Sequence, residues 1–163
     1  MSEPIYQLEG ITQRYAGKTV LSLPGLTLEG PAIVGLIGPN GSGKSTLMRL
    51  LGFLEAPATG RVRYRGQPAR PFDAAIRFKV TMLPQEPFLM HRNVAANIAY
   101  GLKLRGVEGD LNSQIDAALN QVGLDPGEFA RRQWYQLSGG EAQRVALAAR
   151  LALAPRVLLM DEP

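Results

Sequence analysis

The residues best suited to chemistry lie in the segment Gly38–Ser45, which reads GPNGSGKS. It matches the pattern G-x-x-x-x-G-K-[ST], in which glycines let the backbone wrap an anion and point its N–H groups inward. Lys44 supplies a positive charge for β- and γ-phosphates, and the Ser45 hydroxyl suits Mg²⁺. A chance glycine-rich turn is the alternative, but the segment follows an apolar run and precedes a helical pattern, as the motif requires. The predicted polyphosphate site comprises Gly38, Pro39, Asn40, Gly41, Ser42, Gly43, Lys44, Ser45 and Thr46.

Two carboxylates, Asp161 and Glu162, directly follow the apolar run Val157–Met160. Ligands of open α/β sheets gather where parallel strands end, so an acidic pair there is well placed beside a nucleotide. We expect Asp161 to hold Mg²⁺ and Glu162 to orient or deprotonate an attacking water. An acidic pair after a strand is a weak signal alone, and the polyphosphate motif strengthens it.

The segment Leu137–Glu141, LSGGE, predicts a second place for an anion. Ser138 and Glu141 have the S-x-x-E spacing of a capping box, so an ordinary capped helix is one interpretation. Gly139 and Gly140 would expose more backbone N–H groups than a cap needs, which favours a second phosphate cradle. A chain with two cradles either binds two anions or shares one anion between two copies.

Alternating strand and helix patterns must position these residues. An α/β architecture is indicated first, because short apolar runs flank the glycine-rich segment. Residues 31–37 form a nearly continuous apolar run, typical of a strand buried on both faces. After residue 88 the apolar spacing becomes helical. The expected strands are 5–15, 18–28 (broken at Pro24–Gly25), 31–37, 61–64, 80–83 and 157–160. One helix is expected to begin near Lys44 and to carry the apolar residues Leu47, Leu50, Leu51 and Leu54. The other expected helices are 93–104, 111–122 and one that begins after Ser138 and is ended by Pro155.

Composition narrows the class of protein. The chain has 163 residues, of which 45% are hydrophobic, as suits a single folded domain. Cysteine is absent, which excludes a disulfide framework and a thiolate zinc site. No apolar run approaches the roughly 20 residues that span a bilayer, and we expect no secretory signal in the first residues. Any membrane role is therefore expected to act through a partner.

The chain has a net charge of +4. One stretch is rich in arginine and poor in acidic residues, and it contains Arg131, Arg132, Arg144, Arg150 and Arg156. Such a run can face nucleic acid, a membrane surface or an anionic ligand. A solvated basic face is the plainer interpretation. The charge alone does not decide between them.

The ordered set GPNGSGKS, PQEP at Pro84–Pro87, LSGGE and RVLLMDEP resembles the nucleotide-binding subunit of an ATP-binding-cassette (ABC) transporter of the prokaryotic importer type. The resemblance implies a P-loop NTPase core with an inserted helical subdomain. It places part of the core in residues 1–87, the helical subdomain in 88–155, and a strand returning to the core in 156–163. The family chain continues beyond this point, so we expect the core to be incomplete here.

The resemblance also implies roles for single residues. Ser138, Gly139 and Gly140 would meet the γ-phosphate of an ATP held by a second copy, in a homodimer with ATP at its interface. Gln85 would join the subdomains, sense Mg²⁺ and the γ-phosphate, and face the membrane subunit, whereas a plain loop residue is the alternative. Tyr15 would stack on adenine, whereas an ordinary strand aromatic is the alternative. The implied catalytic set is Glu162, Lys44 and Gln85, and the implied metal set is Ser45, Gln85 and Asp161.

Together these features predict a motor subunit that uses ATP and Mg²⁺ to drive dimer closure. Integral-membrane permease subunits would be its partners, a solute-binding protein would act indirectly, and the subunit would sit in the cytoplasm on the inner face of the membrane. Its compactness resembles subunits that serve inorganic anions such as tungstate, molybdate or phosphate. A soluble ATPase of the same superfamily acting on DNA or ribosomes is the alternative, but the chain lacks cysteines and sustained heptads, and we expect no nucleic-acid partner. A non-catalytic module is a third possibility for this stretch of chain.

The sequence departs from the family pattern in one respect. The histidine that contacts the γ-phosphate normally follows the DEP tripeptide, whereas the single histidine here, His91, lies far upstream. We expect His91 to be a surface residue and hydrolysis by this stretch alone to be weak or absent. We also expect Val157–Met160 to lack a neighbouring strand and to present an exposed edge.

Overall fold

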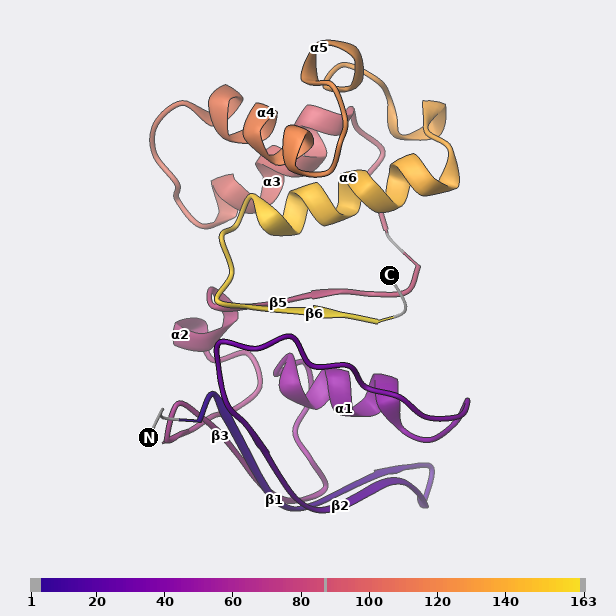
Figure 1. Cartoon of the computed structure of the whole chain (residues 1–163), viewed down its shortest axis with the longest axis vertical. Helices are drawn as coiled ribbons and strands as arrows, with labels where there is room; N and C mark the ends of the chain where they lie inside the picture. Colours follow the sequence, from indigo (N-terminus) through magenta and orange to yellow (C-terminus); the bar gives the residue numbers. More distant parts are fainter. Residues whose placement is uncertain (1–3, 87, 162–163) are drawn as a thin grey trace. The chain divides into compact units, whose positions relative to one another are not determined.

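The computed structural model describes residues 4–86 and 88–161, apart from the side chain of Ala74. The chain divides into two compact units, residues 1–77 and 78–163, and each is described by itself. Figure 1 labels their helices and strands. The α/β architecture predicted from the sequence is confirmed.

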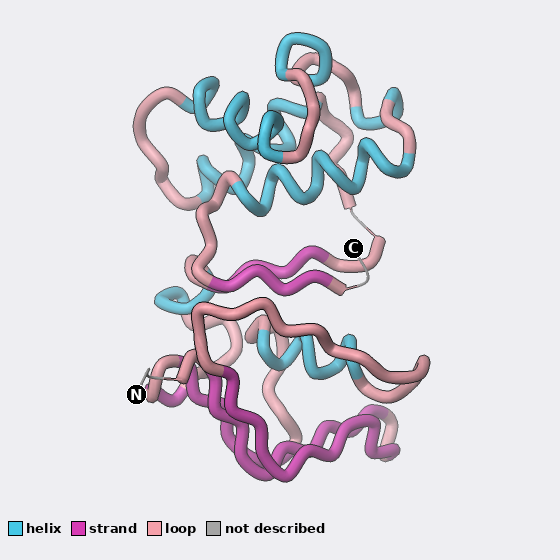
Figure 2. The backbone as a smooth tube through the Cα atoms, viewed as in Figure 1, coloured by secondary structure: helices cyan, strands magenta, loops and turns pink. Residues whose placement is uncertain are grey.

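The first unit contains a four-stranded antiparallel sheet with the order β2-β1-β3-β4 (Figure 2). Its core joins sheet residues to α1, and the Tyr6 hydroxyl donates a hydrogen bond to the carbonyl of Leu51 at 3.0 Å. Phe53 stacks on Tyr6, which fills the space beside that bond. The elements are β1 (Tyr6–Tyr15), β2 (Lys18–Leu28), α1 (Lys44–Leu51), β3 (Thr59–Tyr64), β4 (Gln67–Pro68) and α2 (Ala74–Arg77).

The expected break of β2 at Pro24–Gly25 is wrong. Strand β2 continues through both residues, with Leu23 opposite Ile11 and Gly25 opposite Glu9. Proline lacks an N–H donor, and within this sheet β2 is an edge strand, where such a residue is tolerated. In the partner strand β1, Gly10 lies between the residues paired with Leu23 and Gly25, and its φ of +58° is in the left-handed region that favours glycine.

The expected strand at 31–37 is also wrong. This segment has no regular secondary structure, and Ile33 and Ile37 are almost fully exposed. The apolar run has the composition of a buried strand, but a strand forms only where a neighbour accepts its backbone hydrogen bonds. None of the strands that the structure describes pairs with it.

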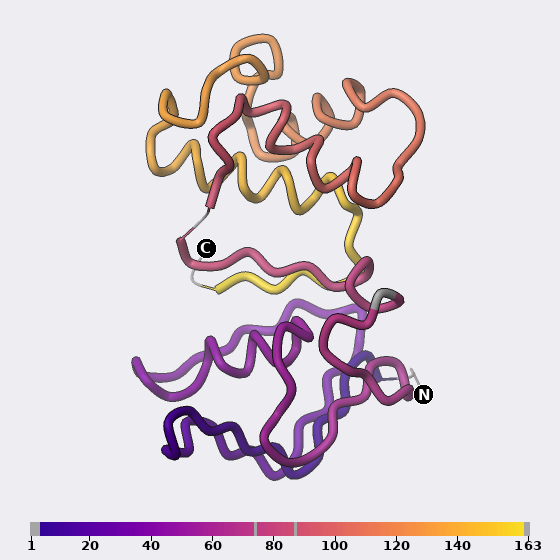
Figure 3. The backbone as a smooth tube through the Cα atoms, turned by 180° about the vertical axis from the view of Figure 1, so that it is seen from behind, coloured from indigo at the N-terminus to yellow at the C-terminus, as the bar shows by residue number. Residues whose placement is uncertain are grey.

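The second unit combines a two-stranded parallel sheet with a helical cluster (Figure 3). Val94, Ile98, Leu119 and Val145 are completely buried where three of the helices meet. The elements are β5 (Val80–Leu83), α3 (Val94–Leu104), α4 (Leu111–Gln121), α5 (Pro126–Phe129), the short helix η1 (Trp134–Gln136), α6 (Gly139–Leu151) and β6 (Val157–Met160). The helices predicted from apolar spacing are thus confirmed, although α6 ends before Pro155.

Strand β6 was expected to lack a neighbour, and that prediction is wrong. It pairs in parallel with β5, with Val157 opposite Val80 and Met160 opposite Leu83. The two apolar runs lie far apart in the sequence, so their pairing depends on the fold of the helices between them. Within the described residues, no helix is long and apolar enough to cross a membrane.

Candidate functional site

The glycine-rich loop leads directly into α1 in the first unit. Gly41 has a φ of +80° and Gly43 a φ of +92°, a backbone conformation that side chains disfavour. A Cβ added at Gly43 would lie 2.9 Å from the carbonyl oxygen of Val20, and one added at Gly38 would lie 2.9 Å from Ser42 Oγ. The loop therefore requires glycine for both conformation and space.

The ammonium group of Lys44 closes this loop. Its Nζ donates to the carbonyl oxygens of Gly38 at 2.8 Å and Pro39 at 3.1 Å. A hydrogen bond within the backbone, from Ser42 N to Pro39 O at 3.2 Å, holds the turn of residues 39–42. An ammonium has three N–H donors, so these two bonds leave a third donor for a phosphate oxygen.

Helix α1 begins differently from the longer helices of the second unit. Its N-cap is Gly43, which makes no side-chain bond to the first turn. In contrast, Asn93, Asp110 and Ser138 accept backbone N–H groups at the starts of α3, α4 and α6. Uncapped N–H groups at a helix start favour an anion, so the start of α1 suits a phosphate.

Tyr15 is the last residue of β1, and the residue is 39% exposed, so its role in stacking on adenine stays a prediction. Its hydroxyl donates to Glu55 Oε1 at 2.5 Å. Glu55 was not singled out from the sequence, because the two residues are 40 positions apart and no local pattern joins them. Its carboxylate fixes the direction of the tyrosine ring.

In the second unit, the ends of β5 and β6 bring Gln85 and Asp161 to one edge of the sheet. The backbone N–H of Asp161 donates to the carbonyl of Leu83 at 3.0 Å, two residues before Gln85. Both strands are parallel, so both following loops leave at the same edge. Glu162, predicted to activate water, lies outside the described residues, as does Pro87 of the PQEP segment.

The predicted capping box at the start of α6 is formed. Ser138 Oγ accepts from Glu141 N at 3.3 Å, while Glu141 Oε2 accepts from both Ser138 N and Ser138 Oγ at 2.7 Å. These bonds, more than nearby arginines, hold the pKa of Glu141 below its usual value, so the group is a carboxylate at neutral pH. A Cβ added at Gly139 or Gly140 would meet nothing within 4 Å, which leaves this turn open on its outer side.

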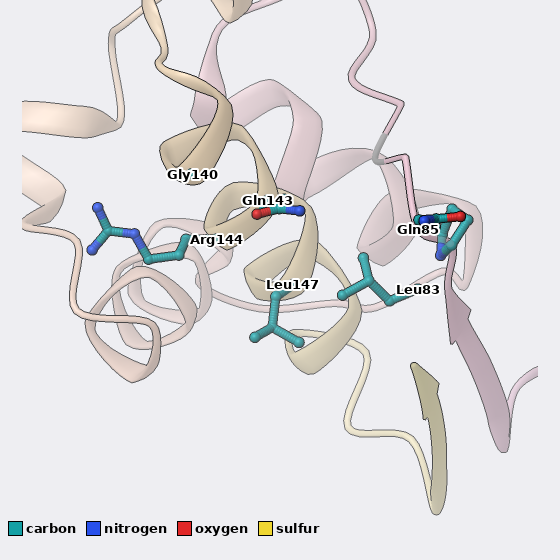
Figure 4. A pocket seen from close by; sticks show the side chains of 7 residues that line it. Leu83, Gln85, Gly140, Gln143, Arg144 and Leu147 are labelled. Carbon is teal, nitrogen blue, oxygen red and sulfur yellow. The ribbon is translucent and has the colours of Figure 1, made fainter. Parts of the chain in front are cut away.

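A pocket of about 180 Å³ lies between the end of β5 and α6, both in the second unit (Figure 4). Figure 4 shows Gln85 at one end and the guanidinium of Arg144 extending away from it. The helix side is formed by residues of α6 that recur three or four positions apart and therefore lie on one face of the helix. The lining residues are Leu83, Pro84, Gln85, Gly140, Gln143, Arg144 and Leu147.

The basic run does not form one solvated face. The Arg132 guanidinium pairs with Glu128 and Glu141. Arg150 donates to the carbonyl of Ala146 at 3.4 Å, and burial lowers the pKa of its guanidinium. Arg144 donates to the carbonyl of Gly123 at 3.4 Å. Several of these charges therefore serve the helical cluster itself.

His91 lies in the loop before α3 and is exposed, as predicted for a surface residue. Its ring stacks on that of Trp134, with centroids 4.4 Å apart and planes 7° from parallel. The ring of Tyr135 packs edge-on against the ring of Trp134. His91 thus belongs to an aromatic cluster in the second unit.

The family model for ABC transporters matches residues 23–163. The chain belongs to this family. It is 38% identical over 157 residues to the tungstate uptake system ATP-binding protein TupC of Peptoclostridium acidaminophilum, covering 96% of the chain and 71% of that protein. It is 41% identical over 164 residues to the Fe(3+) ions import ATP-binding protein FbpC of Streptomyces coelicolor, covering 100% of the chain but only 47% of that protein.

A solved structure shares the fold. The CbiO1 structure from Clostridium perfringens, part of the ABC transporter complex CbiONQ, superposes with a TM-score of 0.83. It is 24% identical to this ABC chain and is matched over 99% of the chain and 66% of its own length. The predicted P-loop ATPase fold and the predicted family are thereby confirmed, and the importer type agrees with the two relatives.

Proposed function

We propose that this chain binds and hydrolyses ATP as the motor subunit of an ABC importer. The observation that carries the proposal is the loop of residues 38–43, closed by Lys44 and leading into the uncapped start of α1. One helix end contributes only about 0.3–2 kcal/mol to anion binding. Micromolar nucleotide binding needs about 8 kcal/mol, so loop, lysine and helix must act together.

The base and the metal take further residues in this proposal. Tyr15 stacks on adenine, an interaction worth about 1–3 kcal/mol that tolerates different bases. Ser45, Gln85 and Asp161 would hold Mg²⁺, and their hydroxyl, amide and carboxylate oxygens are the hard donors it prefers. Bound Mg²⁺ neutralises charge on the β- and γ-phosphates. Glu162 orients the attacking water.

Hydrolysis is coupled to motion through a second copy. Ser138, Gly139 and Gly140 contact the γ-phosphate of the nucleotide held by the partner, so ATP favours a closed homodimer. Loss of that phosphate removes the bridge and shifts the population back to the open form. In this scheme residues 88–155 form the helical subdomain, and residues 1–87 and 156–163 belong to the core.

The motor acts on integral-membrane permease subunits from the cytoplasmic face. The importer relatives support such partners, because each is named as an import or uptake ATP-binding protein. A solute-binding protein would select the cargo, and an inorganic anion such as tungstate is our proposal for it. The tungstate and iron relatives differ in cargo at similar identity, in keeping with a motor that never touches the solute.

Replacing Lys44 with alanine tests the proposal. Charge-assisted hydrogen bonds contribute about 1.5–3 kcal/mol, so we expect affinity for Mg²⁺–ATP to fall by about tenfold or more in isothermal titration calorimetry. Lys103→Ala, at an exposed position of α3, is the matched control and should bind as the unchanged protein does. Equal affinities for all three proteins, or no uptake by the unchanged protein, would contradict a nucleotide motor.

A further inference from the structure

Glu141 places a negative charge beside the proposed site for the γ-phosphate. Its Oε2 atom accepts hydrogen bonds from both the backbone and the hydroxyl of Ser138, each 2.7 Å long. This arrangement orders the turn, and a carboxylate so close to an incoming phosphate also repels it. Therefore the turn can receive a phosphate well only if the charge on Glu141 is balanced.

Arg132 is the residue that balances it. Its Nη1 atom lies 3.4 Å from Glu141 Oε1, the oxygen that faces away from the Ser138 bonds. Its Nη2 atom pairs with Glu128, and its guanidinium lies over the Phe129 ring, 4.2 Å from the centroid. The side chain is 31% exposed, and its contacts with Glu141, Glu128 and Phe129 hold it in place.

The backbone of Arg132 is fixed as well. Its carbonyl oxygen accepts a hydrogen bond from the N–H of Val94 at 2.9 Å, at the start of α3. Val94 is completely buried in the helical core. The guanidinium therefore approaches Glu141 from a rigid base and loses little freedom when it pairs.

Other charges near Glu141 are less well placed. Arg144 also lowers the pKa of Glu141, but less than Arg132 does, and its guanidinium donates to the carbonyl of Gly123, which follows the C-cap of α4. Arg131, the neighbour of Arg132, is exposed and forms no ion pair with any residue that the structure describes. The two adjacent arginines thus differ in their contacts although the sequence presents them alike.

We propose that Arg132 is a positioning residue for ATP binding in trans, acting through Glu141 on Ser138. It neutralises the carboxylate and holds it against the Ser138 backbone, so that the turn receives the γ-phosphate of the partner's nucleotide. This inference depends on the proposed function. Because Arg132 acts through Glu141 in this role and not on the reacting groups, it predicts an effect on nucleotide affinity rather than on the chemical step.

A double-mutant cycle that removes the charges of Arg132 and Glu141 in the intact transporter tests it, with the KM for ATP and kcat measured at saturating Mg²⁺. Pairs of this kind contribute little in water, so we expect Arg132→Met to raise the KM for ATP by about two- to fivefold, with kcat nearly unchanged. Arg132→Lys should restore most of the affinity. Arg131→Met is the matched control and should leave the KM unchanged.

Glu141→Gln removes the charge that Arg132 neutralises but keeps an oxygen for the Ser138 N–H. In that background Arg132→Met should no longer raise the KM. An undiminished effect there, a loss of kcat at constant KM, or an unchanged KM in an active transporter would each overturn the role of Arg132. An unchanged protein without any ATP-dependent activity would instead overturn the proposed function and this inference together.

Discussion

Gly43 forms the junction between the phosphate loop and α1. Its φ of +92° lies in the left-handed region, and the carbonyl of Val20 comes within 2.9 Å of where a Cβ would stand. The same residue leaves the start of α1 without a side-chain cap. One residue thus sets both the shape of the loop and the exposure of the N–H groups that would bind phosphate.

Replacing Gly43 with alanine should both destabilise the protein and weaken nucleotide binding. A side chain held in the left-handed region costs about 1–3 kcal/mol, and the contact with Val20 adds to that cost. We expect a lower midpoint of urea unfolding and a reduced affinity for Mg²⁺–ATP. Circular dichroism and calorimetry measure the two effects separately.

Gly35→Ala is the matched control in the same unit. Its Cβ would meet nothing within 4 Å, and its φ is not in the left-handed region. We expect both its unfolding midpoint and its affinity to match those of the unchanged protein. Equal behaviour of the two variants would show that the loop does not depend on the conformation of Gly43.

Sequence reasoning identified the residues whose role depends on neighbours in the chain. The phosphate loop and the Ser138–Glu141 capping box are of this kind, because every group involved lies within a few positions. The contacts of Glu55 with Tyr15 and of Arg132 with Glu141 were not predicted, since they join residues that only the fold brings together. The role of Glu162 stays a prediction.

Helix α3 is tied at its start to the loop that follows the PQEP segment. Asn97, one turn into the helix, is buried, and its carboxamide bonds to the loop on both sides. Its Oδ1 accepts from Met90 N at 2.8 Å, and its Nδ2 donates to the carbonyls of Met90 at 3.1 Å and Arg92 at 3.3 Å. One side chain thereby fixes the path of the loop relative to the helix.

Replacing Asn97 with alanine should lower the free energy of unfolding. The change leaves buried backbone groups of the loop without their partners, and each such group costs about 1–3 kcal/mol. We expect a clear drop in the midpoint of urea unfolding, together with faster amide exchange at Met90. Asn120→Ala, on the exposed side of α4, is the control and should change neither. A midpoint unaffected by the loss of Asn97 would mean that packing alone holds the loop.

Elements with a clear helical period were predicted within one or two residues, because their apolar stripe and their cap both lie in the local sequence. The ends of α3 and α4 are examples. Residues 31–37 were mispredicted because an apolar run reports composition and not a hydrogen-bonding partner. Strand β6 was correctly bounded, but its pairing with β5 could not be read from either run alone.

At the scale of the whole molecule, the chain combines two compact units, and each of them buries apolar side chains of its own. The sequence predicted the α/β class and the change to helices, and the division at 77 and 78 was not foreseen from the motifs. Each unit buries a set of large apolar residues, such as Ile11 and Leu50 in the first unit and Ile98 and Leu119 in the second. Residues 31–37 are the main departure, since Ile33, Val34 and Ile37 are exposed by 103%, 60% and 95%.

This run of exposed apolar residues should make the chain self-associate. Covering an exposed isoleucine contributes about 1.5–3 kcal/mol, so the double variant Ile33→Ser/Ile37→Ser should weaken association by about tenfold or more in sedimentation equilibrium. The matched control is Phe72→Ser/Leu104→Ser, which removes two residues that are each 64% exposed but far apart in the sequence. Single exposed apolar residues are ordinary on protein surfaces, whereas contiguous ones form patches, so the control should change association much less.

Ammonium sulfate should strengthen association of the unchanged protein more than that of the Ile33/Ile37 variant, because excluded salts favour apolar burial. If both double variants self-associated to the same extent, the surface responsible for self-association would lie outside residues 31–37.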